Sequence, residues 1–282
     1  MTTLFPSKPF NANGASVAPI KRLGQNFLVD KTAIRKIINS ADLQGGDAVL
    51  EIGPGAGALT KIIGRKAKKA IAIEKDARMV EILKKKLVNY ENVKIIEGDI
   101  LKIIFQFPEN YKIIANLPFY ITSPVIRKFL ESDNPPEKMT LVVQKELAQR
   151  ICAKPPKMSI LAVSVQIYSE PKIVDYIPKT AFWPKPKVDA AILEISCIKK
   201  KFDAVLMEKF FKIVKSGFSH PRKQILNNFA NSLVLNPRKN IKLNKEKIIA
   251  WLAANKIQTN QRAETLSIED WINLAKTSEI VA

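Results

Sequence analysis

The sequence predicts an α/β fold, in which helices cover both faces of a mostly parallel β-sheet, followed by a smaller helical domain. Up to residue 198, short apolar runs alternate with segments in which apolar residues recur every three or four positions. From Lys199 onward only the helical spacing remains. We therefore expect a flexible tail (1–20), a sheet domain (21–198) and a helical domain (199–282).

The amino-terminal elements are expected to be this tail and one amphipathic helix. Residues 1–20 contain no acidic residue and mix Ser, Asn, Pro and Gly, a composition typical of flexible segments. Asp30 can cap a helix by accepting a hydrogen bond from its first turn. Ile34, Ile37 and Ile38 then fall on one face of that helix.

Apolar runs short enough to be buried strands follow along the chain, and several end at a polar residue or a glycine. The expected strands are Ala48–Ile52, Ala70–Ile73, Val93–Ile96, Ile113–Ala115, Leu141–Val143, Val163–Ile167 and Ala190–Ile195. In open α/β sheets, ligands bind beyond the carboxyl ends of the strands. Gly53, Glu74, Asp99 and Asn116 follow four of these strands, which makes them candidate site residues.

A glycine turn follows the first strand. Gly53, Gly55 and Gly57 stand on alternate positions, directly before apolar residues at helical spacing. Glycine permits positive φ and a close approach of the backbone to a ligand, and a helix start presents free N–H groups. The pattern predicts a ligand-binding turn, although a glycine-rich turn that binds nothing would have the same sequence.

The acidic residues around this turn favour S-adenosylmethionine as the ligand. Glu74 lies 21 residues beyond Gly53, where a carboxylate can accept both hydroxyls of a ribose in either a dinucleotide or S-adenosylmethionine. The G-x-G-x-G spacing departs from the dinucleotide pattern. Glu51 would repel a pyrophosphate but attract a cationic ammonium or sulfonium. Asp99 could accept the adenine amine, although helix capping or turn formation also explains Glu51 and Asp99.

A second motif, Asn116-Leu117-Pro118-Phe119, predicts methylation of an exocyclic amine. The lone pair of such an amine is delocalised into the ring. Accepting its two N–H bonds at the Asn116 side chain and at a carbonyl near Leu117 would draw the nitrogen toward tetrahedral geometry. Pro118 stiffens the turn and Phe119 offers a face for stacking. The residues would act by positioning and electrostatics, whereas a simple strand-end turn is the alternative.

The amino-acid composition indicates which kinds of molecule this protein could bind. Lys and Arg total 46 against 26 acidic residues, a formal charge of +20, which favours nucleic acid, although a lysine-rich proteome would also produce it. His220 is the only histidine, which argues against a His-based triad or a metal site. Cys152 and Cys197 are expected to be reduced core residues. No apolar run approaches the roughly 20 residues of a membrane span.

Several stretches between Lys21 and Asn228 together resemble the ribosomal RNA adenine N6-dimethyltransferases. The resemblance is specifically to the bacterial enzymes that dimethylate two adjacent adenines near the 3′ end of small-subunit (16S) RNA. The matching stretches are Leu23–Leu28, Glu51–Gly57, Glu74–Asp76, Gly98–Asp99, Asn116–Tyr120 with Pro124, Gln144–Glu146, Phe182–Val188 and Phe218–Asn228.

The resemblance implies a class I methyltransferase (Rossmann-like) fold, with a seven-stranded sheet whose last strand is antiparallel, and an all-helical carboxyl domain that contacts RNA. Phe119 would stack on the target adenine and Phe182 would cover its other face, while Arg222 and Lys223 would bind RNA. The residues implied for S-adenosylmethionine are Asn26, Leu28, Gly53, Glu74, Asp99 and Asn116, and those implied for catalysis are Asn116, Leu117, Pro118 and Phe119. The expected partner is small-subunit ribosomal RNA within a pre-30S particle, and we expect a cytoplasmic monomer without metal or membrane.

Three rival functions remain. A related dimethyltransferase of large-subunit RNA, of the antibiotic-resistance type, would share fold and pocket, but the long carboxyl region beginning at Phe218 favours the small-subunit enzyme. A non-catalytic RNA-binding assembly or transcription factor on the same fold is disfavoured by the intact motif at Asn116–Phe119. A nicotinamide oxidoreductase is disfavoured by the glycine spacing and by the charge of +20.

Overall fold

The computed structural model describes residues 17–104, 107–198, 202–236, 241–242 and 244–278. The described chain divides into two compact units. The first unit runs to Ala148 and resumes at Ser169–Ile198, and the second combines Gln149–Tyr168 with the described residues from 202 onward. The segment Gln149–Tyr168, which lies within the sheet domain expected from the sequence, thus packs with the helical region.

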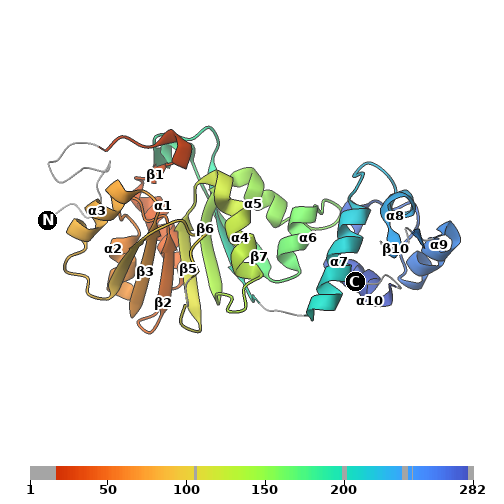
Figure 1. Ribbon diagram of the computed structural model, residues 1–282. Coiled ribbons are helices and arrows are strands. Elements are labelled where there is room, and N and C mark those ends of the chain that lie inside the picture. Colours follow the sequence, from red (N-terminus) through yellow and green to blue (C-terminus); the bar gives the residue numbers. More distant parts are fainter. Residues whose placement is uncertain (1–16, 105–106, 199–201, 237–240, 243, 279–282) are drawn as a thin grey trace. The chain divides into compact units, whose positions relative to one another are not determined.

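The first unit is built on a seven-stranded sheet (Figure 1). β9 is antiparallel to both of its neighbours, and the other neighbouring strands are parallel. This arrangement confirms the predicted class I methyltransferase fold with an antiparallel last strand. In order across the sheet, the strands are β4 (Val93–Glu97), β3 (Lys69–Glu74), β2 (Ala48–Ile52), β5 (Tyr111–Asn116), β6 (Lys138–Gln144), β9 (Ala190–Ser196) and β7 (Glu170–Ile177).

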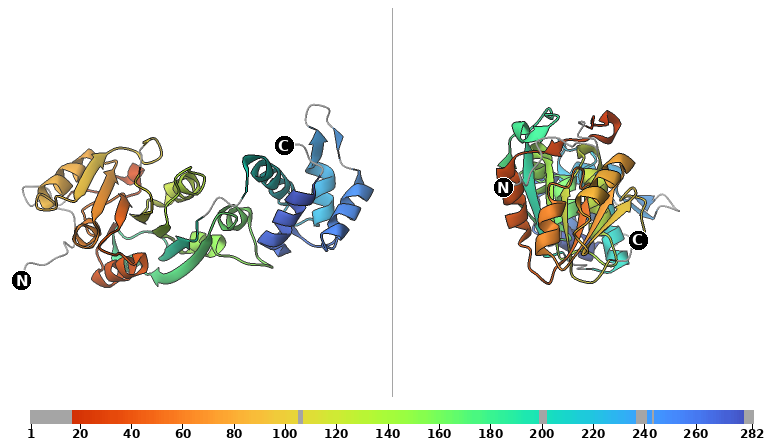
Figure 2. Two further views of the ribbon diagram at one scale, coloured as in Figure 1. Left: turned by 90° about the horizontal axis from the view of Figure 1, so that it is seen from below. Right: turned by 90° about the vertical axis from the view of Figure 1, so that its left-hand side faces the viewer.

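Helices lie on both faces of the sheet, and the view from below in Figure 2 shows α1 (red) on one face and α4 (yellow-green) on the other. From β2 the chain first adds β3 and β4 on one side, and then returns to add β5 and β6 on the other side. Right-handed crossovers therefore place α2 and α3 on the face opposite α4. The helices of this part of the chain are α1 (Lys31–Ala41), α2 (Thr60–Lys66), α3 (Ala77–Lys86), α4 (Thr122–Leu130) and α5 (Lys145–Ile151).

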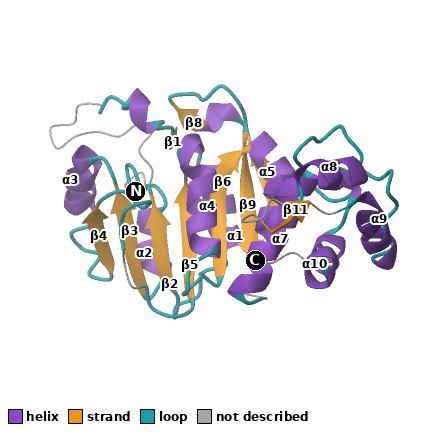
Figure 3. Cartoon of the chain, turned by 45° about the vertical axis from the view of Figure 1, so that its right-hand side comes forward, coloured by secondary structure: helices purple, strands orange, loops and turns teal. Residues whose placement is uncertain are grey.

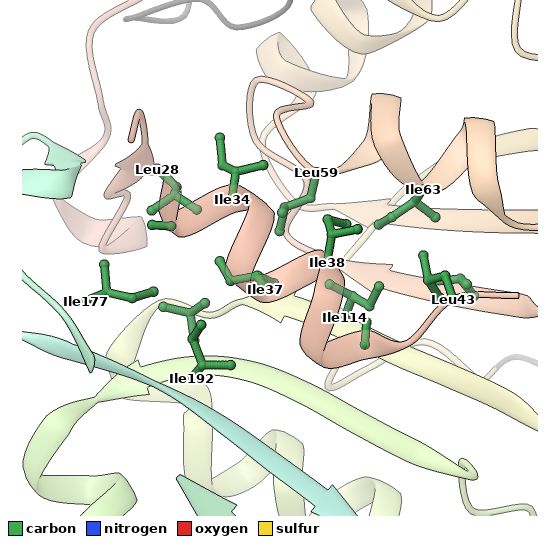
Figure 4. Packing of buried hydrophobic residues seen from close by; sticks show 14 of the residues in the cluster. Leu28, Ile34, Ile37, Ile38, Leu43, Leu59, Ile63, Ile114, Ile177 and Ile192 are labelled. Atoms are coloured by element: carbon green, nitrogen blue, oxygen red, sulfur yellow. The ribbon is translucent and has the colours of Figure 1, made fainter. Parts of the chain in front are cut away.

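The α1 face of the sheet holds a large apolar cluster (Figure 4). Ile34, Ile37 and Ile38 of α1 are buried against Ile114 of β5 and Ile192 of β9. Asp30 caps the helix as predicted, because its side chain accepts a hydrogen bond of 2.6 Å from the Ala33 N–H. The periodicity of the isoleucines and the cap together specify α1 locally.

The predicted strand at Val163–Ile167 is wrong. Helix α6 (Ile160–Gln166) occupies this stretch, and β7 begins after it. Ser159 caps α6 by accepting a hydrogen bond of 3.2 Å from the Ala162 N–H. A short apolar run is equally compatible with a strand and with a buried helix, so its periodicity did not discriminate between them. β7 carries exposed residues at alternate positions, and hence no apolar run marks it in the sequence.

The second unit packs helices around large aromatic side chains. Phe210, Phe229 and Trp271 are buried in it. A two-stranded ribbon, β10 (Val234–Asn236) with β11 (Ile241–Lys242), adds to the expected helices and was not predicted from the sequence. After α6, the helices are α7 (Ala204–Gly217), α8 (Ile225–Ser232), α9 (Lys245–Ala254) and α10 (Ile268–Thr277), with a short 3₁₀ helix η4 (Ala263–Thr265).

Three smaller findings concern the remaining expectations. The predicted flexible tail lies outside the described residues up to residue 16, but Val17 is buried in a cluster with Phe27. Cys197 is exposed and Cys152 is half-buried, so the expectation that both are core residues is wrong. Among the described residues, no helix is long and apolar enough to cross a membrane, and no group of three or more His, Cys, Asp or Glu side chains could hold a metal ion.

Candidate active site

A pocket lies at the carboxyl edge of the sheet, where β2, β3, β4 and β5 end. Figure 3 shows β1 (Phe27–Leu28) and β8 (Phe182–Trp183) beyond the arrowheads of these parallel strands. The pocket brings together the residues expected to bind the cofactor and the target base: Asn26, Leu28, Gly53, Glu74, Asp99, Asn116, Leu117, Pro118, Phe119 and Phe182. Glu51 and Tyr120 also line it.

The glycine turn forms one wall of the pocket and requires its glycines. The φ angles of Gly53, Gly55 and Gly57 are +68°, +54° and +82°, in the region that side chains disfavour. A Cβ on Gly57 would also lie 2.9 Å from Cδ2 of Leu83, and one on Gly55 would lie 3.1 Å from the Phe27 ring. The turn therefore requires glycine for its backbone conformation and its packing, and the close approach to a ligand stays a prediction.

Glu74 stands at the end of β3, against the glycine turn. Its Oε2 accepts a hydrogen bond of 3.0 Å from the Gly55 N–H, and its Oε1 accepts one of 2.8 Å from the Asp76 N–H. Burial raises the pKa of the carboxyl, whereas these two hydrogen bonds lower it. The two backbone donors fix the orientation of the carboxylate, and each oxygen retains a lone pair for a further donor.

Glu51 is the most buried acidic side chain of the pocket, with 2 % of its surface exposed. Within the described chain, its Oε2 has no hydrogen-bond partner. Burial is the largest of the effects that raise the pKa of Glu51 to about 8; the Thr60 hydroxyl opposes it, and the neighbouring Glu74 adds to it. Such a carboxyl is costly to bury unless a positive group or a donor pairs with it.

The loop after β4 is held by two lysines. Lys75 Nζ lies 2.9 Å from Asp99 Oδ2, and this ion pair lowers the pKa of Asp99. Lys128 of α4 donates hydrogen bonds of 2.6 and 2.7 Å to the carbonyl oxygens of Ile100 and Ile103. The position of Asp99 and Ile100 in the pocket therefore depends on a helix that begins just after the Asn116 turn.

Asn116 is oriented by the amino-terminal segment. Its Nδ2 donates a hydrogen bond of 3.0 Å to the Asn26 carbonyl oxygen. Because the amide nitrogen is engaged there, the side-chain oxygen is the atom that remains to accept a hydrogen bond from a ligand. Phe119, two residues after the buried Leu117, is half-buried and packs against the α1 face cluster.

Strand pairing, ring stacking and hydrogen bonds hold the segment Val17–Leu28 beside the pocket. β1 pairs with β8, and the Phe27 and Trp183 rings stack with their centroids 6.1 Å apart. Gln25 Nε2 donates to Asp76 Oδ2 at 2.8 Å. Arg78 pairs with the same carboxylate at 2.7 Å and also donates to the Ala18 carbonyl oxygen.

The remaining predicted site residues, Arg222 and Lys223, belong to the second unit. They are exposed in the turn between α7 and α8. Asn228 fixes this turn, because its Nδ2 donates to the carbonyl oxygens of Gly217 and His220 at 2.6 and 3.1 Å. Sequence reasoning included Asn228, Gln25 and Asp76 in the matching stretches but predicted none of these contacts, and it did not find Lys128 or Arg78. Their partners lie too far away in the sequence, or are backbone atoms without a residue signature.

The strand order, the glycine turn and the acidic strand ends define a class I methyltransferase. Solved structures agree with this class. A dimethyladenosine transferase from Plasmodium falciparum superposes with a TM-score of 0.75 and 28% identity, covering 87% of this chain and 94% of that one. The 23S rRNA methyltransferase ErmE superposes with a TM-score of 0.71 and 25% identity, covering 90% and 99%.

The chain belongs to the ribosomal RNA adenine dimethylase family, whose family model matches residues 20–277. It is 40% identical to ribosomal RNA small subunit methyltransferase A of Dehalococcoides mccartyi (strain CBDB1), over 93% of this chain and 89% of the relative. It is 39% identical to the protein of the same name from Geobacillus thermodenitrificans (strain NG80-2), over 90% and 89%. The recognition of the family from its motifs is thereby confirmed.

Proposed function

We propose that this protein transfers methyl groups from S-adenosylmethionine to N6 of two adjacent adenines near the 3′ end of small-subunit ribosomal RNA. The product is N6,N6-dimethyladenosine. One observation carries the proposal: the Asn116–Phe119 turn lines the same pocket as the glycine turn, so that donor and acceptor of a methyl group have adjoining sites. The relatives at about 40% identity, named as small-subunit methyltransferases, support this choice of RNA.

The pocket residues fit S-adenosylmethionine. The buried Oε2 of Glu51 lacks a partner within the described chain, and a cationic ammonium or sulfonium would supply one. Glu74, fixed by two backbone donors, suits the ribose hydroxyls, and Asp99 suits the adenine amine. Gly53 leaves room for the ligand, and Asn26 and Leu28 close the pocket from the amino-terminal segment. When bound, S-adenosylmethionine supplies a methyl group on a positively charged sulfur.

The protein's own contribution is to hold the target amine and base. Asn116 Oδ1 and a backbone carbonyl near Leu117 would accept the two N–H bonds of the amine. The Asn26 carbonyl keeps the Asn116 amide in the orientation that exposes this oxygen. Pro118 has no N–H to compete, and Phe119 offers a ring face to the adenine. Phe182 of the β1–β8 strand pair lines the pocket and is itself buried, and it would cover the other face of the base.

The target adenine must leave its helical stack to reach this pocket, because its amine is otherwise inaccessible. Arg222 and Lys223, exposed on the second unit, would bind RNA phosphates. We infer that residues 21–198 carry the transfer chemistry and that residues 199–282 contact RNA. We further infer that the natural substrate is a pre-30S particle, and that the protein works as a cytoplasmic monomer.

The test supplies labelled S-adenosylmethionine together with unmethylated small subunits and, in parallel, unmethylated large-subunit RNA. The expected result is label in N6,N6-dimethyladenosine from the small subunits alone. Label in the large-subunit RNA would instead favour the resistance-type function, for which the likeness to ErmE is the supporting observation. If neither RNA yields dimethyladenosine, the result would favour the non-catalytic RNA-binding function.

A further inference from the structure

Tyr120 is a large aromatic side chain that stands exposed at the mouth of the pocket. It lines the pocket, yet 57% of its surface is accessible to solvent. The transfer chemistry proposed above uses its neighbour Phe119 and leaves Tyr120 without a role. The exposed ring therefore stands where a substrate that enters the pocket must pass.

The local backbone explains why the two consecutive aromatic residues face different environments. Phe119–Ile121 form the 3₁₀ helix η2, in which successive side chains are about 120° apart. Phe119 packs against the α1 face cluster and lines the pocket. Tyr120 is consequently directed away from the core.

One edge of the Tyr120 ring lies close to the backbone of Gly24. A Cβ on Gly24 would lie 3.3 Å from Cδ1 and 3.4 Å from Cε1 of this ring. Gly24 also has a φ of +60°, as the residue that ends the 3₁₀ helix η1 (Lys21–Leu23). Any other residue there would strain the backbone, and its Cβ would press on one edge of the ring, so Gly24 allows the ring to lie close to this segment.

Cationic side chains lie on the segments beside the ring. Lys75, which is paired with Asp99, interacts electrostatically with both Tyr120 and Arg22. Lys75 and Arg22 are exposed, and Lys102 is exposed on the loop after β4. Aromatic faces combined with lysine and arginine are the elements by which proteins bind unpaired nucleic acid strands, the rings stacking on bases and the cations pairing with phosphates.

We infer that Tyr120 is a stacking platform for the nucleotide next to the target adenine, with the exposed Arg22 pairing with the adjoining phosphate. This inference rests on the proposed function, because it supposes an RNA adenine in the pocket. Once that adenine is flipped out, its neighbour loses one stacking partner, and the Tyr120 ring replaces it. Tyr120 would thereby contribute to the choice of sequence around the target.

The test compares Tyr120→Leu with the natural protein on reconstituted small subunits. Three forms of the RNA are used: unaltered, with an abasic nucleotide on the 5′ side of the adenine pair, and with one on the 3′ side. Base–aromatic stacking of about 1–3 kcal/mol corresponds to at least a fivefold change. Tyr120→Leu should raise KM for unaltered subunits about tenfold, and Tyr120→Phe, which keeps the ring, should stay within about twofold.

The decisive comparison is between the variant and the abasic RNA. One of the two abasic substitutions should raise KM for the natural protein but should have no further effect on Tyr120→Leu, because both changes remove the same contact. The KM for S-adenosylmethionine should not change. Tyr176→Leu is the matched control, since Tyr176 is an exposed tyrosine of the same unit that does not line the pocket.

Two results would overturn the inference. In the first, the abasic substitutions affect Tyr120→Leu as strongly as the natural protein. In the second, Tyr120→Leu raises KM for S-adenosylmethionine and not for the RNA, which would mean that the ring only packs on Gly24. Failure of the proposed function would look different, because the natural protein would then methylate none of the subunits.

Discussion

Glu51 should make the binding of S-adenosylmethionine depend on pH. Burial raises the pKa of its carboxyl from the ordinary value of 4.5 to about 8, so that the carboxyl is protonated at pH 6 and 7. A cationic ligand beside it favours the carboxylate. Binding below pH 8 should therefore release a proton. The free energy needed to deprotonate Glu51 makes the free energy of binding less favourable.

The size of the effect follows from the distance between pH and pKa. Each pH unit below 8 costs about 1.36 kcal/mol, a factor of ten in affinity. At pH 6 the affinity should be up to about 100-fold lower than it would be with an ionised Glu51, and at pH 7 about tenfold lower. Because an α-amino group itself titrates near pH 8, the useful window is pH 6 to 7.

The assay is isothermal titration calorimetry at pH 6, 6.5 and 7, in two buffers of different ionisation enthalpy. The natural protein should gain about tenfold in affinity from pH 6 to 7 and should release about one proton on binding. Glu51→Gln has nearly the same shape but cannot ionise, so its affinity should be constant over this range. The reasoning is refuted if both proteins show the same pH dependence, or if the natural protein releases no proton.

The same pKa also determines a change in stability without ligand. A carboxyl whose folded-state pKa is raised above its unfolded value destabilises the folded state progressively as pH rises from 4.5 toward 8. Glu51→Gln removes this penalty. The variant should consequently gain thermal stability over the natural protein at pH 8, and the difference should shrink toward pH 5.

Three further predictions concern the acceptor site, the loop after β4 and the RNA. Asn116→Ala should lower kcat by about 10²–10³-fold in the methylation assay, which is the usual effect of losing one positioned polar group. Calorimetry should still detect cofactor binding, and near-normal turnover would exclude Asn116 from catalysis. Lys128→Met removes two charge-assisted hydrogen bonds and should weaken cofactor binding about tenfold. Arg127→Gln changes an exposed residue at the preceding position and should not weaken it; equal effects of the two would contradict a positioning role for Lys128. RNA affinity should fall steeply with salt concentration. The Arg222→Gln/Lys223→Gln double variant should reduce the slope of the logarithm of the RNA association constant against the logarithm of the salt concentration by about 1.5–2. An unchanged slope would mean that these two residues do not contact phosphate.

Several parts of the architecture and the site could be predicted because they depend on short-range patterns. The Asp30 cap and the isoleucine period defined α1, and the apolar runs ending at Gly53, Glu74, Asp99 and Asn116 defined strands of known direction. In a parallel sheet these ends meet at one edge, so the candidate pocket followed from topology. The helix α6 could not be distinguished from a strand, because a short apolar run satisfies both.

The sequence by itself determined which chemical groups this protein has: the three glycines of the turn, the carboxyls of Glu51 and Glu74, and the Asn116 turn. The tertiary structure alone decided how those groups are held and charged. The buried Glu51 with its raised pKa, the Asn116 amide fixed by the Asn26 carbonyl, and the contact of Tyr120 with Gly24 all depend on neighbours distant in the chain. Burial and hydrogen-bond geometry are properties of packing, and residue spacing does not encode them.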